Sequence, residues 1–424
     1  MKHFGDITKL NGAELPVVDC ITGGSPCQDL SVAGKRTGLA GERSGLFMEQ
    51  IRIVKEMREN DRRSNGRTGW HVRPRYMVWE NVPGAFSSNG GGDFGAVLTE
   101  IARVEEPEAP DVLMPNGGWP HSGCIYSEVG AWSIAWRVHD AQFWGVPQRR
   151  KRIALVADFG GMSAPEVLFE RKGLRWDTEE GGKAEQGAAG RAENSTRGTI
   201  SFQERGGKPG GGKGILIQNE HVGALSTLNN QSVLAIENHP ADSRVKISED
   251  NVVQTLSSRM GTGGGNVPMM IDTYSMQAIG EYKQSDVGSS LKERDYKDAT
   301  DLVSASVVRR FTPLECERLQ SYPDGWTDIG SWVDSNGKLH KESSDSARYK
   351  ALGNSIALPF WFYLLRRISA QYERPATLGS LFDGIGGFPL CWERCNGQGT
   401  ALWASEIEEF PIAVTKVHFP EVEP

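Results

Sequence analysis

A short apolar strand that ends in a turn with a single cysteine constrains the fold of this chain more than any other stretch. Pro16–Ile21 is rich in β-branched residues, which predicts a buried strand. It leads into Gly23–Gln28, which contains Cys27, and then into a loop of small, polar and basic residues. Open α/β sheets bind ligands beyond the carboxyl ends of their strands, and Cys27 falls at such a position. Simple burial as a small apolar side chain is the competing interpretation of this cysteine.

Length and charge favour a globular protein that meets a polyanion on one face only. The chain has 424 residues, of which 38% are hydrophobic and 24% charged, enough for two or three domains. It contains no apolar run of the roughly 20 residues that a membrane span needs, no signal peptide at its start, and no cysteine spacing typical of a disulfide framework or a metal site. We therefore expect a cytoplasmic protein without a bound metal. The net charge of −7 excludes a uniformly basic surface, although residues 35–75 carry an excess of Lys and Arg.

Strands and helices alternate over the first 160 residues. Apolar residues at helical spacing predict a helix at Leu46–Met57, whereas the polar stretch Glu59–Arg75 predicts a loop. Strands are expected at Tyr76–Trp79, Trp132–Val138 and Ile153–Ala157, with polar residues next to their ends. This pattern indicates an α/β domain.

The composition changes near Gly160 and changes back shortly before Thr312. Between these points, Gly-rich turns separate strand-like segments such as Ile215–Ile217 and Val267–Ile271, which predicts a smaller β-rich domain. Thr312 then caps a helix, with proline at its first position and glutamate at its third. We expect a catalytic domain formed by residues 1–160 and 341–424, interrupted by a second domain at residues 161–340.

The last fifty residues form another α/β unit with the features of a nucleotide site. Strands are expected at Thr377–Leu381 and Thr400–Ala404, followed by Phe382–Gly387 and by Glu406. Glycines after a strand let a ligand approach the backbone, and an acid about 20 residues later can bind ribose hydroxyls. This loop lacks the spacing of the dinucleotide pattern, which disfavours a nicotinamide cofactor. S-adenosylmethionine, with a carboxylate, a ribose and no phosphate, fits it better.

Five motifs together resemble those of the bacterial and phage DNA cytosine 5-methyltransferases. They are Pro26–Gln28, Glu80–Val82, Gln148–Arg152, Gly353–Ser355 and Phe382–Gly387. The resemblance covers the chain outside residues 160–306. It implies a Rossmann-like, S-adenosylmethionine-dependent methyltransferase sheet of the α/β class, with a smaller β-rich target-recognition domain.

The order of the motifs departs from that of the family. There the Gly-rich motif comes first, followed by the ribose-binding acid and a Gly-Asp-Ile motif. Here Gly5–Ile7 comes first, while the Gly-rich loop and Glu406 come last. This order resembles a circular permutation, which surface loops tolerate. A truncated tandem fusion is the competing account.

The resemblance implies covalent catalysis on cytosine. Carbon 5 of the base is a poor nucleophile until a group adds to carbon 6, and Cys27 is the expected nucleophile. A lowered thiol pKa would help this step. Glu80 is expected to contact or protonate a ring nitrogen, while Arg150 and Arg152 hold the base carbonyl and the acid, Arg150 being favoured for the carbonyl. A polar strand end and a solvated turn are the competing interpretations.

The resemblance also implies contacts to cofactor and DNA. The target base must leave the stacked duplex to reach the thiol. Residues expected around S-adenosylmethionine are Phe382, Asp383, Gly384, Ile385, Gly386, Gly387, Glu406, Ile407, Asp6, Ile7, Pro26, Leu46, Asn354 and Ser355. Ile407 stands where relatives often carry a stacking aromatic. Residues expected at DNA are Gln28, Ser31, Lys35, Arg36, Arg43 and Gln148.

The expected partners are double-stranded DNA and a cognate restriction endonuclease, in a restriction-modification or phage setting. We expect a monomer, with a swapped dimer as the alternative. Two rival functions remain: methylation of tRNA, and DNA binding without catalysis. The long segment at residues 160–306 disfavours the first rival, and the intact set of motifs disfavours the second.

Overall fold

The computed structural model describes most of the catalytic part of the chain at the level of side chains. These residues are 1–25, 45–169 and 311–421, together with Val253, Thr255 and Leu256. Between residues 200 and 310 it otherwise describes the backbone of short strands. The residues predicted in the loop after β2 lie outside the described residues; they are Pro26, Cys27, Gln28, Ser31, Lys35, Arg36 and Arg43.

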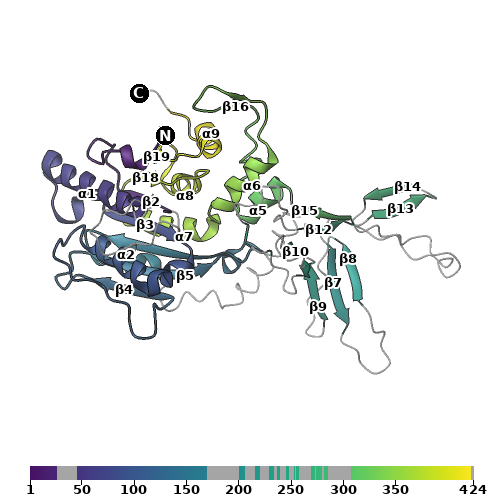
Figure 1. Ribbon diagram of the computed structural model, residues 1–424, viewed down its shortest axis with the longest axis horizontal. Coiled ribbons are helices and arrows are strands. Elements are labelled where there is room, and N and C mark those ends of the chain that lie inside the picture. Colours follow the sequence, from purple (N-terminus) through teal and green to yellow (C-terminus); the bar gives the residue numbers. More distant parts are fainter. Residues whose placement is uncertain are drawn as a thin grey trace.

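An eight-stranded sheet, in the order β1-β19-β18-β2-β3-β6-β5-β4, forms the centre of the described body (Figure 1). Neighbours from β1 to β3 run parallel, whereas β6, β5 and β4 are each antiparallel to the strand before them in this order. Strands from the end of the chain therefore lie between strands from its beginning. The strands are β1 (Lys2–Phe4), β2 (Cys20–Gly23), β3 (Tyr76–Asn81), β4 (Ser122–Tyr126), β5 (Ser133–Asp140), β6 (Lys151–Asp158), β18 (Leu378–Leu381) and β19 (Ala401–Ser405).

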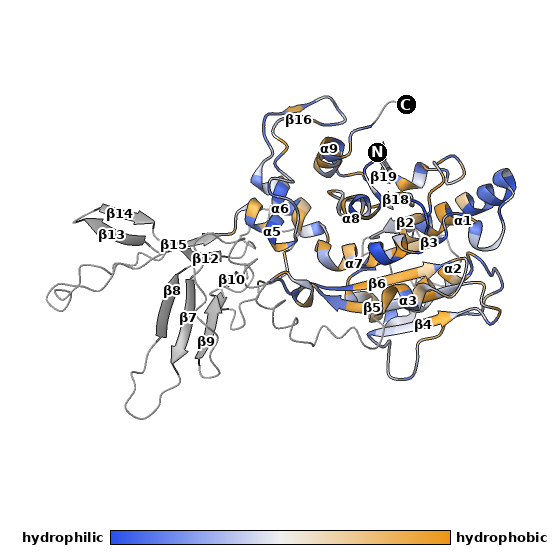
Figure 2. Cartoon of the chain, turned by 180° about the vertical axis from the view of Figure 1, so that it is seen from behind, coloured by the Kyte–Doolittle hydropathy of each residue, from blue (hydrophilic) through white to orange (hydrophobic). Residues whose placement is uncertain are grey.

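Helices cover both faces of the sheet, which explains why its central strands are almost continuously apolar. Side chains alternate along β3, so that Tyr76 and Val78 face one core while Met77 and Trp79 face the other. Helices α1 (Gly45–Asn65) and α2 (Gly92–Ala102) pack on the Trp79 side. Helices α3 (Ala164–Leu168), α7 (Leu358–Ser369) and α8 (Gly387–Asn396) pack on the Val78 side. Figure 2 shows that β6 is largely hydrophobic.

The remaining described elements pack around the Val78 side of the sheet. Buried residues of α5 and α9 belong to the same core as those of α7. The predicted capping box at Thr312 is confirmed, because its hydroxyl accepts from the Glu315 N–H and the Glu315 carboxylate accepts from the Thr312 N–H. No helix in the described ranges is long and apolar enough to cross a membrane. These elements are α5 (Pro313–Leu319), α6 (Asp345–Asn354), α9 (Glu409–His418), β16 (Trp332–Val333) and β17 (Leu339–His340).

Short strands follow residue 200, as the sequence predicts. They form sheets in the orders β8-β7-β9, β11-β10-β12-β15 and β13-β14. Whether this part is a separate recognition domain remains a prediction. The strands are β7 (Ile200–Arg205), β8 (Ile215–Asn219), β9 (Asn229–Val233), β10 (Ile236–Asn238), β11 (Val245–Ile247), β12 (Met269–Asp272), β13 (Tyr274–Ala278), β14 (Glu281–Gln284) and β15 (Val307–Arg310).

The prediction of a loop at Glu59–Arg75 was wrong for residues 59–65, because α1 continues to Asn65. Two polar residues of the helix beyond Met57 are buried, whereas Glu59 and residues 62–65 are exposed. Arg58 is buried and donates to the carbonyl of Val72 at 3.0 Å. Asp61 is also buried and accepts the backbone N–H of Arg73 at 2.8 Å. These long-range partners let polar residues extend a buried helix.

The two ends of the described chain lie side by side (Figure 1). The amino group of Met1 donates to the carbonyl of Pro420 at 3.0 Å. The hydroxyl of Ser405 donates to the carbonyl of Gly5 at 2.6 Å. The last strands thus complete the sheet begun by the first strands of the same chain.

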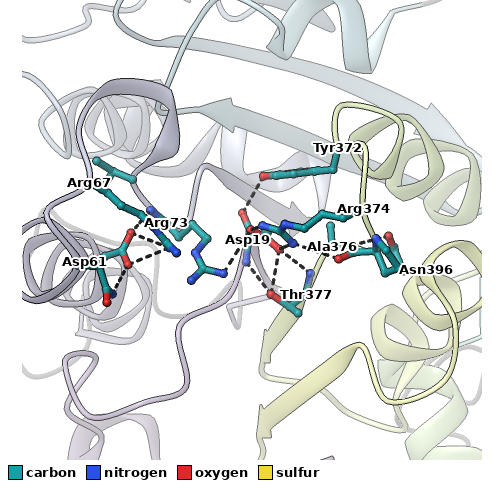
Figure 3. A network of polar contacts seen from close by, with 12 residues as sticks. Asp19, Asp61, Arg67, Arg73, Tyr372, Arg374, Ala376, Thr377 and Asn396 are labelled. Carbon is teal, nitrogen blue, oxygen red and sulfur yellow. Dashed lines mark hydrogen bonds and ion pairs between the residues drawn. The ribbon is translucent and has the colours of Figure 1, made fainter.

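A buried carboxylate ties the start of β2 to the start of β18 (Figure 3). Asp19 is fully buried and accepts two hydrogen bonds of 2.7 Å from Arg374. It also accepts the Thr377 N–H at 2.8 Å, and its own N–H donates to the Thr377 carbonyl at 3.0 Å. Burial alone would raise the pKa of Asp19, but the hydrogen bonds and charge of Arg374, together with Thr377, hold that pKa below its ordinary value.

Replacing this carboxylate should loosen the junction between the two ends of the chain. Asp19→Ala leaves the partly buried Thr377 N–H without its carboxylate acceptor, and we expect a loss of about 1–3 kcal/mol in the free energy of unfolding. Since the pKa of Asp19 is depressed, its contribution is present above about pH 4 and is lost as the pH falls further. Urea unfolding at pH 7 and at acidic pH measures both effects. Asp111→Ala removes an ion pair whose carboxylate side chain is 73% exposed, and it should change little.

Candidate active site

The polar residues expected at the site follow neighbouring strands at one edge of the sheet. Because β1, β19, β18, β2 and β3 run parallel, their carboxyl ends meet at the same edge. Strand β6 runs the other way, so its amino end reaches that edge too. The residues that follow these ends are Asp6, Glu406, Phe382, Gly24 and, at the end of β3, Glu80, with Arg152 beside it on β6.

Glu80 and Arg152 form an ion pair at this edge. The guanidinium Nε of Arg152 lies 2.8 Å from Oε1 of Glu80, and the two side chains are only 14% and 16% exposed. A charged pair so far from bulk water is held in a fixed geometry. It can present an acidic oxygen and guanidinium donors to the same planar ligand.

The chain reaches the Pro-Cys-Gln segment directly beside Glu80. Ser25 is buried, with its hydroxyl accepting from the Trp79 indole at 3.0 Å and its carbonyl accepting from the Asn81 amide at 3.0 Å. A Cβ on Gly24 would lie 2.9 Å from Oε2 of Glu80, so a larger residue at this position would force the Glu80 carboxylate to shift. Ser25 is the last described residue before the segment that contains Cys27.

Arg150 lies inside the protein, away from solvent. Its side chain donates to the carbonyls of Leu256 at 2.9 Å, of Gly353 at 3.0 Å and of Ser355. It is 1% exposed. Burial, followed by the nearby charge of Arg152, lowers the pKa of Arg150. The neighbouring Gln148 is buried as well, and its amide has no hydrogen-bond partner among the described residues.

The Gly-rich loop after β18 has the backbone of a ligand cradle. Phe382 has a φ of +53°, an unfavourable region for a non-glycine residue and one that is enriched at functional sites. Gly386 has a φ of +80° and precedes the first residue of α8, where backbone N–H groups are free to meet an anion. Ile385 is buried, and its carbonyl accepts from the Trp326 indole at 2.8 Å. Gly387 begins α8 against the hydroxyl of Tyr322.

Glu406 joins the Gly-rich loop to the strand beside it. Its Oε2 accepts the Gly384 N–H at 2.7 Å, while its Oε1 accepts the N–H groups of Ile407 at 2.7 Å and Glu408 at 2.9 Å. A carboxylate can accept about four hydrogen bonds, so this one retains capacity for a hydroxyl ligand. The side chain of Ile407 is 69% exposed, which suits a surface that an apolar ring would cover.

Asp383 is a buried carboxyl group beneath this loop. Its Oδ1 accepts from Ser380 at 2.5 Å, and its Oδ2 has no hydrogen-bond partner among the described residues. Burial raises the pKa of Asp383 to about 7; the Ser380 hydrogen bond opposes this shift, and the charge of Glu406 adds to it. The unpaired oxygen is the kind of group that a cationic ligand would satisfy.

The other expected cofactor residues are distributed around the same edge. Asp6 caps the short helix at Ile7 by accepting from Thr8, which lowers the pKa of Asp6. Ile7 is buried, and Leu46 near the start of α1 is partly buried. Asn354 ends α6 with an exposed side chain, and the hydroxyl of the buried Ser355 donates to Gln320 at 2.7 Å.

The sequence did not indicate His139, which lies behind the acid–arginine pair. His139 pairs with Arg152 in the β5–β6 register and stacks on Phe360 with ring centroids 3.6 Å apart. It is 4% exposed, and neither ring nitrogen has a hydrogen-bond partner within the described ranges. Burial, then the charges of Arg152, Arg137 and Arg150, lowers its pKa well below the ordinary value. The imidazole of His139 is therefore neutral where it lies opposite Arg152. This position could be found only from the register of β5 and β6.

The cysteines that the structure describes are poor candidates for a thiolate. Burial raises the thiol pKa of Cys20, Cys316 and Cys391 well above the ordinary value, and that of Cys395 to about 11. Cys124 is exposed on β4, at the opposite side of the sheet from β1. No group of three potential ligands among the described residues is arranged to hold a metal ion.

Comparison with known proteins adds a family match to this geometry. A family model described as C-5 cytosine-specific DNA methylase matches residues 1–105 and 126–370, well over half of the chain. A protein of Escherichia phage P1 named DNA N-6-adenine-methyltransferase is 25% identical over 475 residues, covering 87% of this chain and 55% of that protein. Type II methyltransferase M.BsuFI of Bacillus subtilis is 29% identical over 170 residues, or 40% of this chain and 32% of the relative. The chain thus spans about half or less of the length of these relatives.

Among solved structures, the S. pombe Dnmt2 methyltransferase has 13% sequence identity and a TM-score of 0.41. The match covers 86% of this chain and 83% of that one. A putative DNA modification methyltransferase from an E. coli prophage has 15% identity and a TM-score of 0.39, with coverage of 86% and 84%.

The buried Asp383 should make stability depend on pH near neutrality. Its folded pKa of about 7 lies above the ordinary value of about 4, so the protonated carboxyl is favoured by folding. This contribution is complete below about pH 4 and disappears as the pH rises through about 7. Asp383→Asn is neutral at every pH and should not show this decline. The difference in unfolding free energy between wild type and variant should shrink by about 1–4 kcal/mol from pH 4 to pH 8.

Urea unfolding at several pH values measures this difference. Asp345→Asn, at an exposed position in α6, is the matched control and should parallel the wild type. Parallel curves for Asp383→Asn and the wild type would mean that the pKa of Asp383 is the same in the folded and unfolded protein, which would contradict the raised pKa.

Proposed function

The chain belongs to the C-5 cytosine-specific DNA methylase family, and we propose that it transfers a methyl group from S-adenosylmethionine to carbon 5 of a cytosine in duplex DNA. One observation carries this proposal beyond family membership. The Glu80–Arg152 pair lies beside Ser25, two residues before Cys27, at the sheet edge that also holds the Gly-rich loop. An acid, a guanidinium, a thiol segment and a nucleotide loop are the groups that this reaction requires.

Cys27 is the proposed nucleophile. Its sulfur forms a bond to carbon 6 of the cytosine, which raises the electron density on carbon 5. When bound, S-adenosylmethionine supplies an electrophilic methyl group to that carbon. Loss of the carbon 5 proton and expulsion of the thiolate then restore the ring. The raised pKa values of the four buried or partly buried thiols support Cys27 over those cysteines.

Glu80 and Arg152 are proposed to act on the pyrimidine edge. The carboxyl group of Glu80 contacts the ring nitrogen and stabilises the charge that develops there when sulfur adds. Arg152, whose Nε holds Glu80, keeps other guanidinium donors for the base carbonyl. This division differs from the sequence-based expectation, which favoured Arg150 for the carbonyl. We revise it because the Nη atoms of the buried Arg150 donate to protein carbonyls.

The Gly-rich loop and the acids around it fit the parts of S-adenosylmethionine. The free N–H groups at the start of α8 suit its carboxylate, and the unpaired oxygen of Asp383 suits its ammonium group. Glu406 retains acceptor capacity for the ribose hydroxyls, and the exposed Ile407 offers an apolar surface to the adenine. Asp6, Ile7, Pro26, Leu46, Asn354 and Ser355 are proposed to complete the pocket.

Duplex DNA is the proposed substrate, and the extruded cytosine is proposed to bind beside Glu80. Residues around 170–310 are proposed to read the target sequence. Gln28, Ser31, Lys35, Arg36, Arg43 and Gln148 are proposed to contact the DNA. A restriction-modification role with a cognate endonuclease, and a monomeric state, belong to the same proposal. Methylation of tRNA is the rival function. Comparing methyl transfer to duplex DNA with methyl transfer to tRNA distinguishes the two.

Adenine methylation is the second candidate, because the phage P1 relative is named as an adenine N6 enzyme. That name describes a protein of which this chain covers 55%. An exocyclic amine carries its own lone pair and does not need a thiolate to activate it. Cytosine carbon 5 does need one, so the Cys27 motif that follows Ser25 in the sequence favours the cytosine reaction.

We also infer that the motif order is a circular permutation of the family order. Strands β18 and β19, from the end of the chain, take places between β1 and β2 in the sheet. The family match ends at residue 370, before the Gly-rich loop. Both observations support a chain in which the cofactor elements follow, rather than precede, the catalytic motifs.

Removing the thiol should abolish methyl transfer. Cys27→Ala should lower tritiated methyl incorporation into duplex DNA by at least about 1000-fold, because the thiol makes and breaks the covalent bond. Affinity for DNA and for S-adenosylhomocysteine should stay close to that of the wild type. In the presence of S-adenosylmethionine, a duplex with 5-fluorocytosine at the target should remain covalently attached to wild-type protein, since after methyl transfer carbon 5 carries fluorine in place of the proton whose loss releases the thiolate. Cys124→Ala is the control and should stay active.

The methylated product should be identified in the same experiment. Mass spectrometry of nucleosides from the treated DNA should show 5-methylcytosine, and its loss in Cys27→Ala. N6-methyladenine as the sole product would overturn the proposed reaction. Methyl transfer to tRNA but not to duplex DNA would overturn the proposed substrate.

Rearranging the chain should test the permutation. Deleting residues 375–424 should eliminate cofactor binding, because β18, β19 and the Gly-rich loop are removed. A chain that starts at Thr377 and joins Pro420 to Met1 through a short linker should retain activity, because those two ends are in hydrogen-bond contact. Calorimetric titration with S-adenosylhomocysteine measures both variants. Activity recovered by mixing Cys27→Ala with the deleted chain would instead indicate a swapped dimer.

A further inference from the structure

Three segments that are far apart in the sequence meet at the side chain of Arg150. Its Nη1 donates to the carbonyl of Leu256 at 2.9 Å, and its Nη2 donates to the carbonyls of Gly353 at 3.0 Å and of Ser355. The side chain is 1% exposed. Arg150 immediately precedes β6, whose Arg152 holds Glu80. One residue directly before β6 thus binds, through its guanidinium, both the turn at Asn354 and a segment from the centre of the chain.

The central segment docks on the residues next to Arg150 through its backbone. The Val253 N–H donates to the Pro147 carbonyl at 2.9 Å, and the Arg149 N–H donates to the Val253 carbonyl at 2.9 Å. The hydroxyl of Thr255 donates to the Arg149 carbonyl. Val253 and Leu256 are buried in the core that also contains α7. This docking site connects the sheet to the part of the chain proposed to read DNA sequence.

The turn at Asn354 connects the same guanidinium to the proposed cofactor site. Arg150 holds the carbonyls on both sides of Asn354, whose side chain is exposed. Ser355 also donates to Gln320, and Gln320 donates to the Leu352 carbonyl at 2.8 Å. The turn therefore has few ways to move without disturbing Arg150.

We propose that Arg150 is a positioning residue that couples the binding of target DNA to the binding of cofactor. This inference rests on the proposed function of the site. A planar guanidinium has donors in fixed directions, so a shift of Leu256 changes the geometry available to Gly353 and Ser355. Leaving a buried charge without its acceptors is costly, which makes the three segments move together. A segment displaced by cognate DNA therefore alters the turn at Asn354 and the start of β6.

The alternative is that Arg150 only stabilises the fold. In that case its loss would weaken binding of DNA and cofactor by factors that do not depend on each other. Coupling predicts a different quantity, which is the ratio of cofactor affinity with and without cognate DNA. Linkage requires that the cofactor tighten DNA binding by the same ratio.

Two variants distinguish coupling through Arg150 from a role of Arg150 in fold stability alone. Arg150→Lys keeps a positive charge but replaces the fork with one ammonium group, which cannot reproduce the same set of carbonyl contacts. Thr255→Val removes only the exposed hydroxyl that ties the central segment to Arg149, and it leaves Arg150 intact. Thr400→Val is the matched control. It removes a comparable exposed hydrogen bond, from the Thr400 hydroxyl to the Gly397 carbonyl, that is not made by Arg149, Arg150 or the central segment.

The experiment uses the full chain and a duplex that carries the site found by bisulfite sequencing of DNA from an expressing host. The dissociation constant of S-adenosylhomocysteine is measured by calorimetry under three conditions: without DNA, with this duplex, and with a scrambled duplex. For the wild type and Thr400→Val we expect the cognate duplex to tighten cofactor binding by ~5–150-fold. Thr255→Val should bind cofactor normally without DNA but lose most of this ratio, and Arg150→Lys should bring it to about one.

Each outcome decides a different point. A wild type that methylates DNA but shows a ratio of about one overturns the coupling. The coupling is also overturned if Thr255→Val keeps the wild-type ratio, whether or not Arg150→Lys folds. A wild type that methylates no DNA overturns the proposed function itself, which separates that failure from failure of the coupling.

Discussion

The contact between Asp19 and Thr377 joins two stretches that are 358 positions apart in the sequence, and the active-site edge depends on it. Asp19 precedes β2, and Thr377 precedes β18, so their hydrogen bonds align the two strands at their amino ends. Alignment at one end of a parallel pair sets the register at the other. In this register Leu381 faces Gly23, which places the Gly-rich loop next to the turn that leads to Cys27.

The sheet places groups of opposite chemistry at separate positions along one edge. Glu406 and Asp383 provide acidic oxygens around the Gly-rich loop, and one of them is buried with an unpaired oxygen. Glu80 and Arg152 form the charged pair beyond β2, with the neutral His139 behind the arginine. The proposed cofactor and base regions are therefore separated by β2 alone in the order of the sheet.

The sequence predicted those parts of the site that depend on strand ends. Glu80 lies at the end of an apolar strand, Glu406 and the Gly-rich loop each follow one, and parallel strands bring such positions together. The structure brings these three to one edge. The partners of Arg150 could not be predicted, because its acceptors come from residues 256, 353 and 355.

Two further features required the tertiary structure. His139 was not predicted because only the β5–β6 register places it opposite Arg152. The extension of α1 was missed because the polar residues Arg58 and Asp61 find buried partners in a later loop. The residues predicted around Cys27 lie outside the described residues, and their roles remain predictions.

A crystal structure of the complex that forms from the protein, S-adenosylmethionine and a duplex carrying 5-fluorocytosine at its target tests the central claim most directly. We expect continuous density from Sγ of Cys27 to carbon 6 of an extruded base, with Glu80 and Arg152 on its polar edge. The cofactor should lie over the Gly-rich loop, with its ribose hydroxyls at Glu406 and its methionine sulfur facing carbon 5. A base that is stacked in the duplex, or a cofactor bound away from the ends of β18 and β19, would contradict the account.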